Sequence, residues 1–128
     1  MAKASQPKGE LTLRTIAMPA DTNPADDIFG GWVLSQMDIA GGIAARTHTR
    51  IRVVTVSITS MTFITPVKVG DLLTIYTEIG RIGRTSVAIK METWVRRGLN
   101  EETLRVTEGE FVYVAVDEDG RPTPILKP

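Results

Sequence analysis

Apolar residues recur at helical spacing in one stretch of the chain, from Gly31 to about Thr47. One apolar stripe runs along a single face of the predicted helix and comprises Val33, Met37, Ala40 and Ala44. A second apolar set lies on a neighbouring face and comprises Trp32, Ile39 and Ile43. Only a narrow strip of polar or small residues is left, at Ser35, Asp38, Gly42 and Arg46. A helix this apolar must be enclosed by a large partner surface.

Alternation of apolar and polar residues with a period of two predicts strands on both sides of this helix. A short strand covers residues 11–16, and four longer runs follow the helix, at about 54–59, 73–79, 87–95 and 106–116. Short turns separate these runs and favour antiparallel neighbours, and a single helix covers only one face of such a sheet. The pattern therefore predicts an α+β fold in which a curved antiparallel sheet wraps around one long central helix.

The chain length fits one domain with a sizeable core, and we expect a single domain over residues 1–128. Residues 1–10 and 122–128 are expected to be loosely held tails. The first ten residues lack the apolar segment of a signal peptide, and no stretch approaches the ~20 apolar residues that span a bilayer. We therefore expect a cytoplasmic protein.

Composition removes several classes of function. The 15 basic and 15 acidic residues cancel, so charge gives no reason to expect a nucleic acid or a membrane surface as the main partner. The absence of cysteine excludes a disulfide framework, a thiolate metal site and a cysteine nucleophile. The single histidine, His48, falls at the predicted helix C-terminus, where the helix dipole favours a solvated side chain. With one histidine and no G-x-S-x-G motif, neither a zinc site of the usual kind nor a Ser-His-Asp triad is expected.

Five stretches carry a family resemblance and together run from about Leu11 to Pro122. They read LRTIAMPADTN, DIFGGWVLSQMDIAGG, RVVTVSITSMTFITPVKVGD, GRTSVAIKMETWV and FVYVAVDEDGRP. The block DIFGGW…SQMD is specific, whereas VGD or GRTS alone would be weak. In these stretches the chain resembles the YciA-type acyl-CoA thioesterases of the hotdog-fold superfamily. One position departs from the pattern: where the family reads N-x-N-G-D before IFGG, this chain has Asp26 in place of the glycine.

The resemblance implies a hotdog domain that dimerises edge to edge into one continuous sheet, with two active sites at the dimer interface. Such dimers commonly assemble further into tetramers or hexamers. It also implies hydrolysis of acyl-CoA to a free fatty acid and coenzyme A. The leaving thiol has a pKa near ~8.5, so one carboxylate and a set of amide donors suffice and no cofactor is implied. Two alternatives stay open: a non-catalytic acyl-CoA-binding hotdog protein, and a hotdog dehydratase or hydratase, although such enzymes normally use an active histidine.

Asp38 is the candidate catalytic carboxylate. From the residues alone it fits either a helical aspartate bonded to a backbone group or a partly buried carboxylate, which is costly to bury and therefore a candidate base. The resemblance favours the second interpretation, because the family's catalytic acid lies on the helix after the Gly-Gly block and maps onto Asp38. The sequence does not distinguish a general base from a nucleophile.

The pair Gly30-Gly31 stands where the predicted helix begins. A tight loop-to-helix entry is one reading of this pair. The other is close approach of a ligand to free helix N-terminal amides, which can receive a developing oxyanion, and the resemblance supports it. Asp38 lies seven residues beyond Gly31, or roughly 10 Å along a helix, which is too far for both to act on one carbonyl within one chain. The interface site that the resemblance implies resolves this spacing, and we expect Asp38 of one subunit to face the helix N-terminus of another.

Asn23 and Asp27 suit loop or helix N-terminal positions where their side chains satisfy backbone amides. The resemblance adds a second interpretation. Asp27 occupies the position of a second polar active-site residue, and Asn23 is placed to orient Asp27 or the attacking water.

The segment GRIGRTS, from Gly80 to Ser86, is the candidate coenzyme A site. Gly83 frees the backbone, and Thr85 and Ser86 can form hydrogen bonds with pantetheine. Two arginines, Arg81 and Arg84, can meet phosphates. The same residues equally fit an ordinary hairpin turn with solvated arginines.

Overall fold

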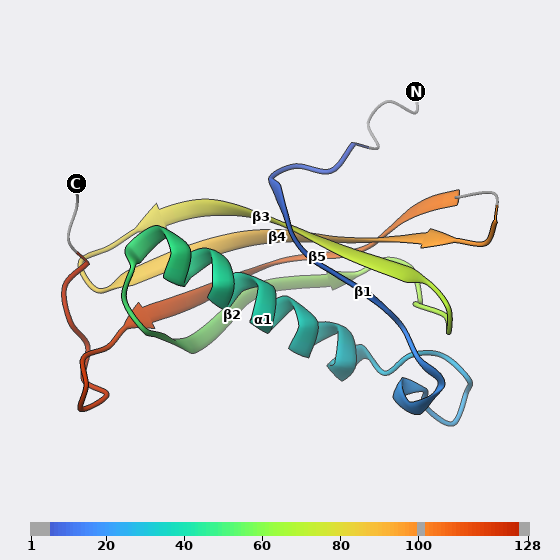
Figure 1. The fold of residues 1–128 in the computed structure, drawn as a ribbon, viewed down its shortest axis with the longest axis horizontal. Helices are drawn as coiled ribbons and strands as arrows, with labels where there is room; N and C mark the ends of the chain where they lie inside the picture. Colours follow the sequence, from blue (N-terminus) through green and yellow to red (C-terminus); the bar gives the residue numbers. More distant parts are fainter. Residues whose placement is uncertain (1–5, 100–101, 126–128) are drawn as a thin grey trace.

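The computed structural model describes residues 6–99 and 102–125, which form one long helix and a five-stranded sheet (Figure 1). Helix α1 spans Gly30–Thr49, and a short 3-10 helix, η2, spans Pro19–Asp21. The strands are β1 (Glu10–Ile16), β2 (Val53–Phe63), β3 (Leu72–Ile82), β4 (Ser86–Arg97) and β5 (Glu102–Ala115). Each predicted element is therefore present. Most observed ends extend beyond the predicted ones, whereas β1 ends at Ile16 as predicted and β5 ends at Ala115, one residue before the predicted end.

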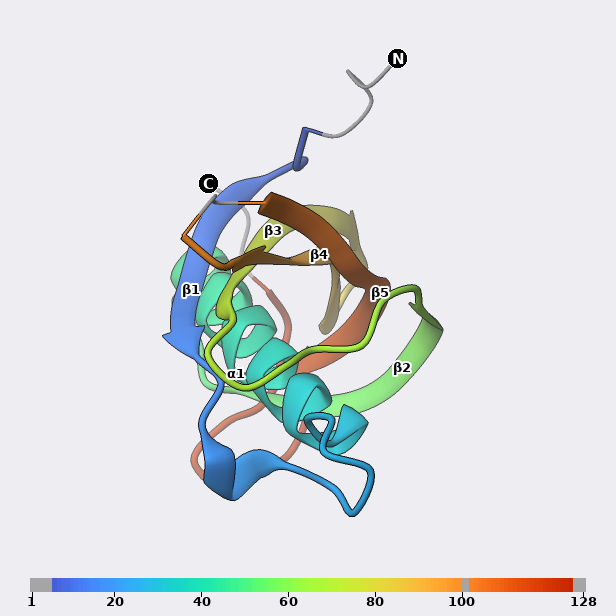
Figure 2. The ribbon, with the colours of Figure 1, turned by 90° about the vertical axis from the view of Figure 1, so that its right-hand side faces the viewer.

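Every pair of neighbouring strands is antiparallel, and the strand order is β1-β3-β4-β5-β2. The two strands that flank α1 in the sequence, β1 and β2, thus form the two edges of the sheet. The sheet curves around α1, which lies against its concave face (Figure 2). The α+β architecture predicted from the sequence pattern is confirmed.

The core fills the space between α1 and the inner face of the sheet. The helix contributes Val33, Met37, Ala40 and Ala45, and the central strands contribute Leu73, Ile75, Val87, Ile89, Met91, Val95, Phe111 and Tyr113. Most of these side chains are at most 2% exposed, and burial of a large apolar side chain contributes about 1.5–3 kcal/mol. The alternate apolar positions predicted for residues 73–79 and 87–95 are therefore the ones that face α1 from the inner face of the sheet.

A second apolar surface stays uncovered in the single chain. Ile39 and Ile43, on the neighbouring face of α1, are 51% and 46% exposed. Along the edge strand β2, the exposed apolar side chains are Val54, Val56, Ile58 and Phe63. In the single chain the sheet covers only one side of α1, so the chain itself supplies only part of the enclosing surface that the sequence predicts for this helix.

Residues 122–125, which lie within the expected C-terminal tail, run back along the end of β5. The amide of Thr123 donates to Ala115, and the amide of Ile125 donates to Arg84, so this stretch is hydrogen-bonded to the β3–β4 turn. In the expected N-terminal tail, residues 6–10 are described, and Glu10 is the first residue of β1. Residues 1–5 and 126–128 lie outside the described part of the chain. Within that part, no helix combines the length and apolar character needed to cross a membrane.

Candidate active site

Asp38 lies in the first half of α1 with its side chain half-buried. Its carboxylate oxygen Oδ1 accepts two hydroxyl hydrogen bonds, from Thr55 on β2 at 2.6 Å and from Tyr113 on β5 at 3.1 Å. The Tyr113 hydroxyl is also 2.9 Å from the Asp38 carbonyl oxygen. The other carboxylate oxygen, Oδ2, accepts no hydrogen bond from the described residues. Oδ2 is therefore the oxygen that can meet a water molecule or a substrate.

The two donors to Asp38 are cross-strand neighbours, since Thr55 and Tyr113 pair directly in the β2–β5 register. The sequence analysis named neither residue, because both read as ordinary strand positions. The signal that would identify them is the pairing of two strands that are far apart in the sequence. A bulge next to Thr55 makes that register still harder to infer.

Tyr113 is 1% exposed, and its ring stacks against Phe111 with the ring centroids 6.4 Å apart. Burial raises the pKa of the Tyr113 phenol well above its ordinary value, and the negative charge of Asp38 raises it further. The phenol therefore keeps its proton at any physiological pH and acts as a hydrogen-bond donor.

The start of α1 offers free backbone donors. The amides of Trp32 and Val33 bond to the Phe29 carbonyl, whereas no hydrogen bond among the described residues uses the amides of Gly30 and Gly31. A Cβ added at Gly31 would meet nothing within 4 Å, so the space beside this residue is open. The structure thus places Gly30 and Gly31 at the positive end of the helix dipole, as the sequence analysis predicted.

An apolar cavity of about 260 Å³ lies beside this helix terminus. Its walls include Gly30 and Val33 from α1, Phe63 at the end of β2, and Val67 and Val106. The cavity suits an apolar group more than a charged one.

Asn23 and Asp27 belong to the loop that leads into α1. The side-chain oxygen of Asn23 accepts hydrogen bonds from the amides of Ala25 and Asp27, at 2.9 and 3.1 Å, so it stabilises the loop. The Asp27 carboxylate forms an ion pair with Lys68, which lies in the turn before β3. In the single chain both residues are engaged within the loop and its neighbour, and neither contacts Asp38.

The candidate coenzyme A residues form the turn between β3 and β4, at the end of the fold where α1 ends (Figure 1). Arg81 and Arg84 are exposed, and the amide of Gly83 bonds to the Ser86 carbonyl as in a tight hairpin. Helix residues Gly30 and Gly31 lie at the opposite end. Within one chain, the two parts of the predicted substrate site therefore lie at opposite ends of the fold. Thr85 and Ser86 are close to Tyr113, because Val87, the residue after Ser86, pairs with Tyr113 in the β4–β5 register.

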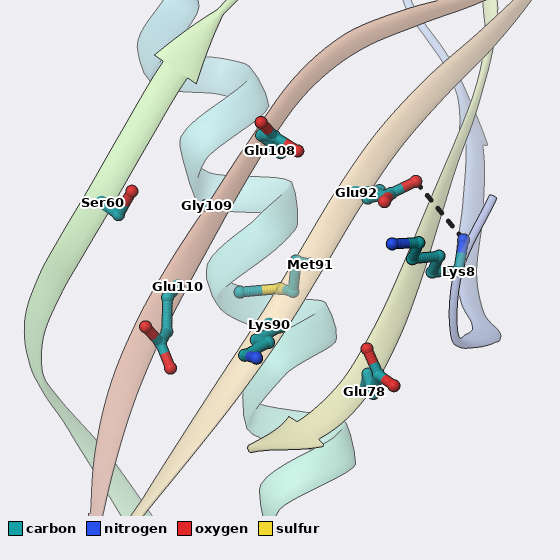
Figure 3. Close-up of a pocket in the computed structure, with 9 residues that line it drawn as sticks. All are labelled: Lys8, Ser60, Glu78, Lys90, Met91, Glu92, Glu108, Gly109 and Glu110. Atoms are coloured by element: carbon teal, nitrogen blue, oxygen red, sulfur yellow. Dashed lines mark hydrogen bonds between the residues drawn. The ribbon is translucent and has the colours of Figure 1, made fainter. Parts of the chain in front are cut away.

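A larger cavity, of about 320 Å³, lies on the outer face of the sheet, with α1 behind it (Figure 3). Its charged lining residues are Lys8, Glu78, Lys90, Glu92, Glu108 and Glu110. It contains none of the predicted site residues. Within the described residues, no group of three or more His, Cys, Asp or Glu side chains could hold a metal ion.

Comparisons with known proteins agree with this geometry. A family model described as "Thioesterase superfamily" matches residues 26–101. The acyl-CoA thioester hydrolase YciA of Salmonella typhimurium is 51% identical over 122 residues, which is 93% of this chain and 92% of that protein. The chain therefore belongs to the thioesterase superfamily.

Two solved structures share the fold closely. The hexameric thioesterase y2039 from Yersinia pestis is 48% identical and superposes with a TM-score of 0.92 over 96% of this chain and 100% of that one. Cj0915, a hexameric hotdog fold thioesterase of Campylobacter jejuni, is 42% identical, with a TM-score of 0.87 over 92% of this chain and 91% of that one. The sheet wrapped around α1 is the hotdog fold.

Proposed function

We propose that this chain hydrolyses acyl-CoA thioesters to a free carboxylic acid and coenzyme A, with Asp38 as the reacting carboxylate. The observation that carries the proposal is the arrangement around Asp38: two hydroxyl groups hold Oδ1, and Oδ2 is left for chemistry. Membership of the thioesterase superfamily and 51% identity to an acyl-CoA thioester hydrolase support the same reaction.

The reaction requires attack on the thioester carbonyl and departure of a thiolate. Asp38 either removes a proton from the attacking water or attacks the carbonyl carbon itself to form a mixed anhydride, which water then hydrolyses. In both routes the carbonyl oxygen gains negative charge, which the free amides at Gly30 and Gly31 are placed to stabilise. The C–S bond breaks, and the thiolate takes up a proton to give coenzyme A.

The complete site is proposed to combine two chains. Asp38 and Gly31 lie seven residues apart on one helix, roughly 10 Å along its axis. The edge strand β2 carries Thr55, the partner of Asp38, and is exposed in the single chain. Pairing two copies along β2 would bring Asp38 of one copy toward the helix N-terminus of the other. The hexameric Yersinia and Campylobacter structures support an assembly of such dimers.

Asp27 and Asn23 are proposed to complete the polar part of the site, and Arg81, Gly83, Arg84, Thr85 and Ser86 to bind coenzyme A. The cavity beside Gly30 is proposed to receive the first carbons of the acyl group, because its walls are apolar and it adjoins the free amides. A cytoplasmic location is also proposed, and the absence of cysteine fits it.

Asp38→Asn tests the assignment. Turnover of a panel of acyl-CoA substrates, followed by release of free thiol, should fall by about 10²-fold or more, because a positioned acid–base residue contributes on that scale. Asp119→Asn, the same chemical change in the exposed turn after β5, should retain wild-type turnover. Near-normal turnover of Asp38→Asn would remove Asp38 from the mechanism. A wild-type protein that binds acyl-CoA without releasing thiol would support the binding-protein alternative.

A further inference from the structure

The two glycines that follow Asp38 on α1 have very different surroundings. A Cβ added at Gly41 would lie 2.2 Å from the Tyr113 hydroxyl oxygen, 2.8 Å from the ring carbon that carries it and 2.9 Å from the terminal methyl carbon of Met91, the flexible end of its side chain. A Cβ added at Gly42 would meet only the edge of the same ring, at 3.8 Å, which is ordinary contact. Helix α1 therefore requires a residue without a Cβ at position 41, whereas position 42 can accept a side chain.

The space at Gly41 is occupied by the phenol that contacts Asp38. Gly41 lies three residues after Asp38, on the adjoining turn of the helix. The Tyr113 hydroxyl enters the gap, reaches the helix backbone at the Asp38 carbonyl and touches the carboxylate oxygen Oδ1. Glycine in a helix interior costs roughly 0.5–1 kcal/mol relative to alanine, so this close approach needs a compensating benefit.

We propose that Tyr113 is a positioning residue for the reacting carboxylate of Asp38, and that Gly41, which has no side chain, leaves the space that the Tyr113 hydroxyl occupies. The proposal rests on the function proposed above, in which Asp38 reacts through Oδ2. Tyr113 and Thr55 together fix the rotation of the carboxylate by holding the same oxygen. Of the two donors, Thr55 lies on the exposed edge strand, whereas Tyr113 is held in the core by its stacking on Phe111.

The phenol suits this task because it is rigid and permanently protonated. Its burial beside a carboxylate raises its pKa, so it donates a hydrogen bond to Oδ1 and does not compete for the proton that Asp38 handles. Phenylalanine at the same position would keep the ring and lose only the donor. The positioning role can therefore be separated from the packing role.

Tyr113→Phe is the first test. We expect kcat for acyl-CoA hydrolysis to fall about tenfold or more, the range that loss of a hydrogen bond to a charged group gives, while KM changes less than about twofold. Circular dichroism and assembly mass should match the wild type. A residue that only packs the core would change thermal stability and leave kcat per folded site unchanged.

Gly41→Ala and Gly42→Ala form a matched pair of tests, since both replace a helical glycine with the same residue one position apart. Gly41→Ala should lower kcat at least as much as Tyr113→Phe, because the methyl group displaces the hydroxyl. Gly42→Ala should retain kcat and gain thermal stability. In the double variant Gly41→Ala/Tyr113→Phe the two losses in kcat should not add, and part of the stability lost by Gly41→Ala should return, because the shortest contact is gone.

Unchanged kcat in Tyr113→Phe, in a protein whose Asp38→Asn variant is inactive, would overturn the positioning role and leave the proposed function intact. Equal effects of Gly41→Ala and Gly42→Ala on kcat would also overturn it. Activity in Asp38→Asn would instead overturn the proposed function itself.

Discussion

Asp26 stands where the family pattern has glycine, and its backbone explains why that position is special. Its φ is +68°, in the left-handed region that glycine adopts without strain. Aspartate is among the residues that tolerate this conformation, since its short side chain can bond locally. Aspartate at position 26 is therefore compatible with the left-handed conformation that this loop requires next to Asp27.

The effect of substitutions at Asp26 on the free energy of unfolding should therefore depend on how well each residue tolerates a positive φ. Asp26→Val should lower the free energy of unfolding by about 1–2 kcal/mol, because a β-branched residue is disfavoured in the left-handed region, whereas Asp26→Gly should stay close to the wild type. Chemical denaturation at one fixed protein concentration measures both. Ala25→Val is the control, as this exposed neighbour has no positive φ. Equal losses for Asp26→Val and Ala25→Val would show that φ at residue 26 carries no such cost.

At the same scale, the sequence predicts single residues better than it predicts their partners. Asp38, Gly30 and Gly31 stand out because their types conflict with the surrounding apolar helix. Thr55 and Tyr113 do not stand out, since threonine and tyrosine are ordinary in strands. Their contact with Asp38 depends on strand register and on a bulge, which local patterns do not encode.

Among the elements, the inner strands β3 and β4 were predicted well because each carries buried apolar residues on alternate positions. Strand β2 shows the limit of that rule. Its alternation predicts one buried face, yet nearly all of its side chains are exposed in the single chain, where β2 is an edge strand with a neighbouring strand on one side only. Periodicity identifies a strand but does not say which neighbour covers it.

An ion pair between a buried aspartate and a partly exposed arginine connects the residue before β3 with the end of β4. Asp71, 2% exposed, accepts two hydrogen bonds from Arg97, at 2.9 and 2.7 Å, and a third from the amide of Lys68 at 2.8 Å. The hydrogen bonds that Arg97 donates to Asp71 raise the pKa of the guanidinium, which therefore stays charged at every working pH. Arg97 also donates to the Pro66 carbonyl, so the pair fixes the turn that carries Lys68, the partner of Asp27.

Arg97→Met should therefore be strongly destabilising, by about 3 kcal/mol or more, because it leaves a buried carboxylate without its cation. Arg96→Met is the matched control, since the neighbouring arginine is exposed, and it should change the free energy of unfolding by less than about 0.5 kcal/mol. Denaturation curves for the two variants under identical conditions give the comparison. Similar small effects at both positions would show that solvent already satisfies Asp71.

Two uncovered apolar surfaces dominate the molecule as a whole. Ile39 and Ile43 on α1 are exposed, and so are apolar side chains of the edge strand β2; an unpaired edge strand invites pairing with a second chain. The sequence predicted the apolar helix face but could not assign its cover, because that cover does not belong to the chain itself. A second copy would supply it and would also complete the separated halves of the proposed site.

Complementation between two inactive variants tests this division of the site. Gly31→Val should block the approach to the helix N-terminal amides; the side chain fits its own chain, as no described atom lies within 4 Å of the added Cβ position. Asp38→Ala lacks the carboxylate. Each variant alone should be nearly inactive, and each should have the mass of an oligomer, not that of one 14.0 kDa chain.

Mixed by refolding, the two variants should recover activity, because a heterodimer joins the intact Gly31 of one chain to the intact Asp38 of the other. Random pairing makes half of the dimers mixed, and each mixed dimer has one working site of two. Recovery should therefore approach about a quarter of wild-type activity if the sites act independently. Mixing each variant with itself provides the control. Subunit exchange is demonstrated with differently tagged chains. If exchange occurs without recovery of activity, Gly31 and Asp38 act within one chain. The substrate itself would then have to bridge the seven residues between them.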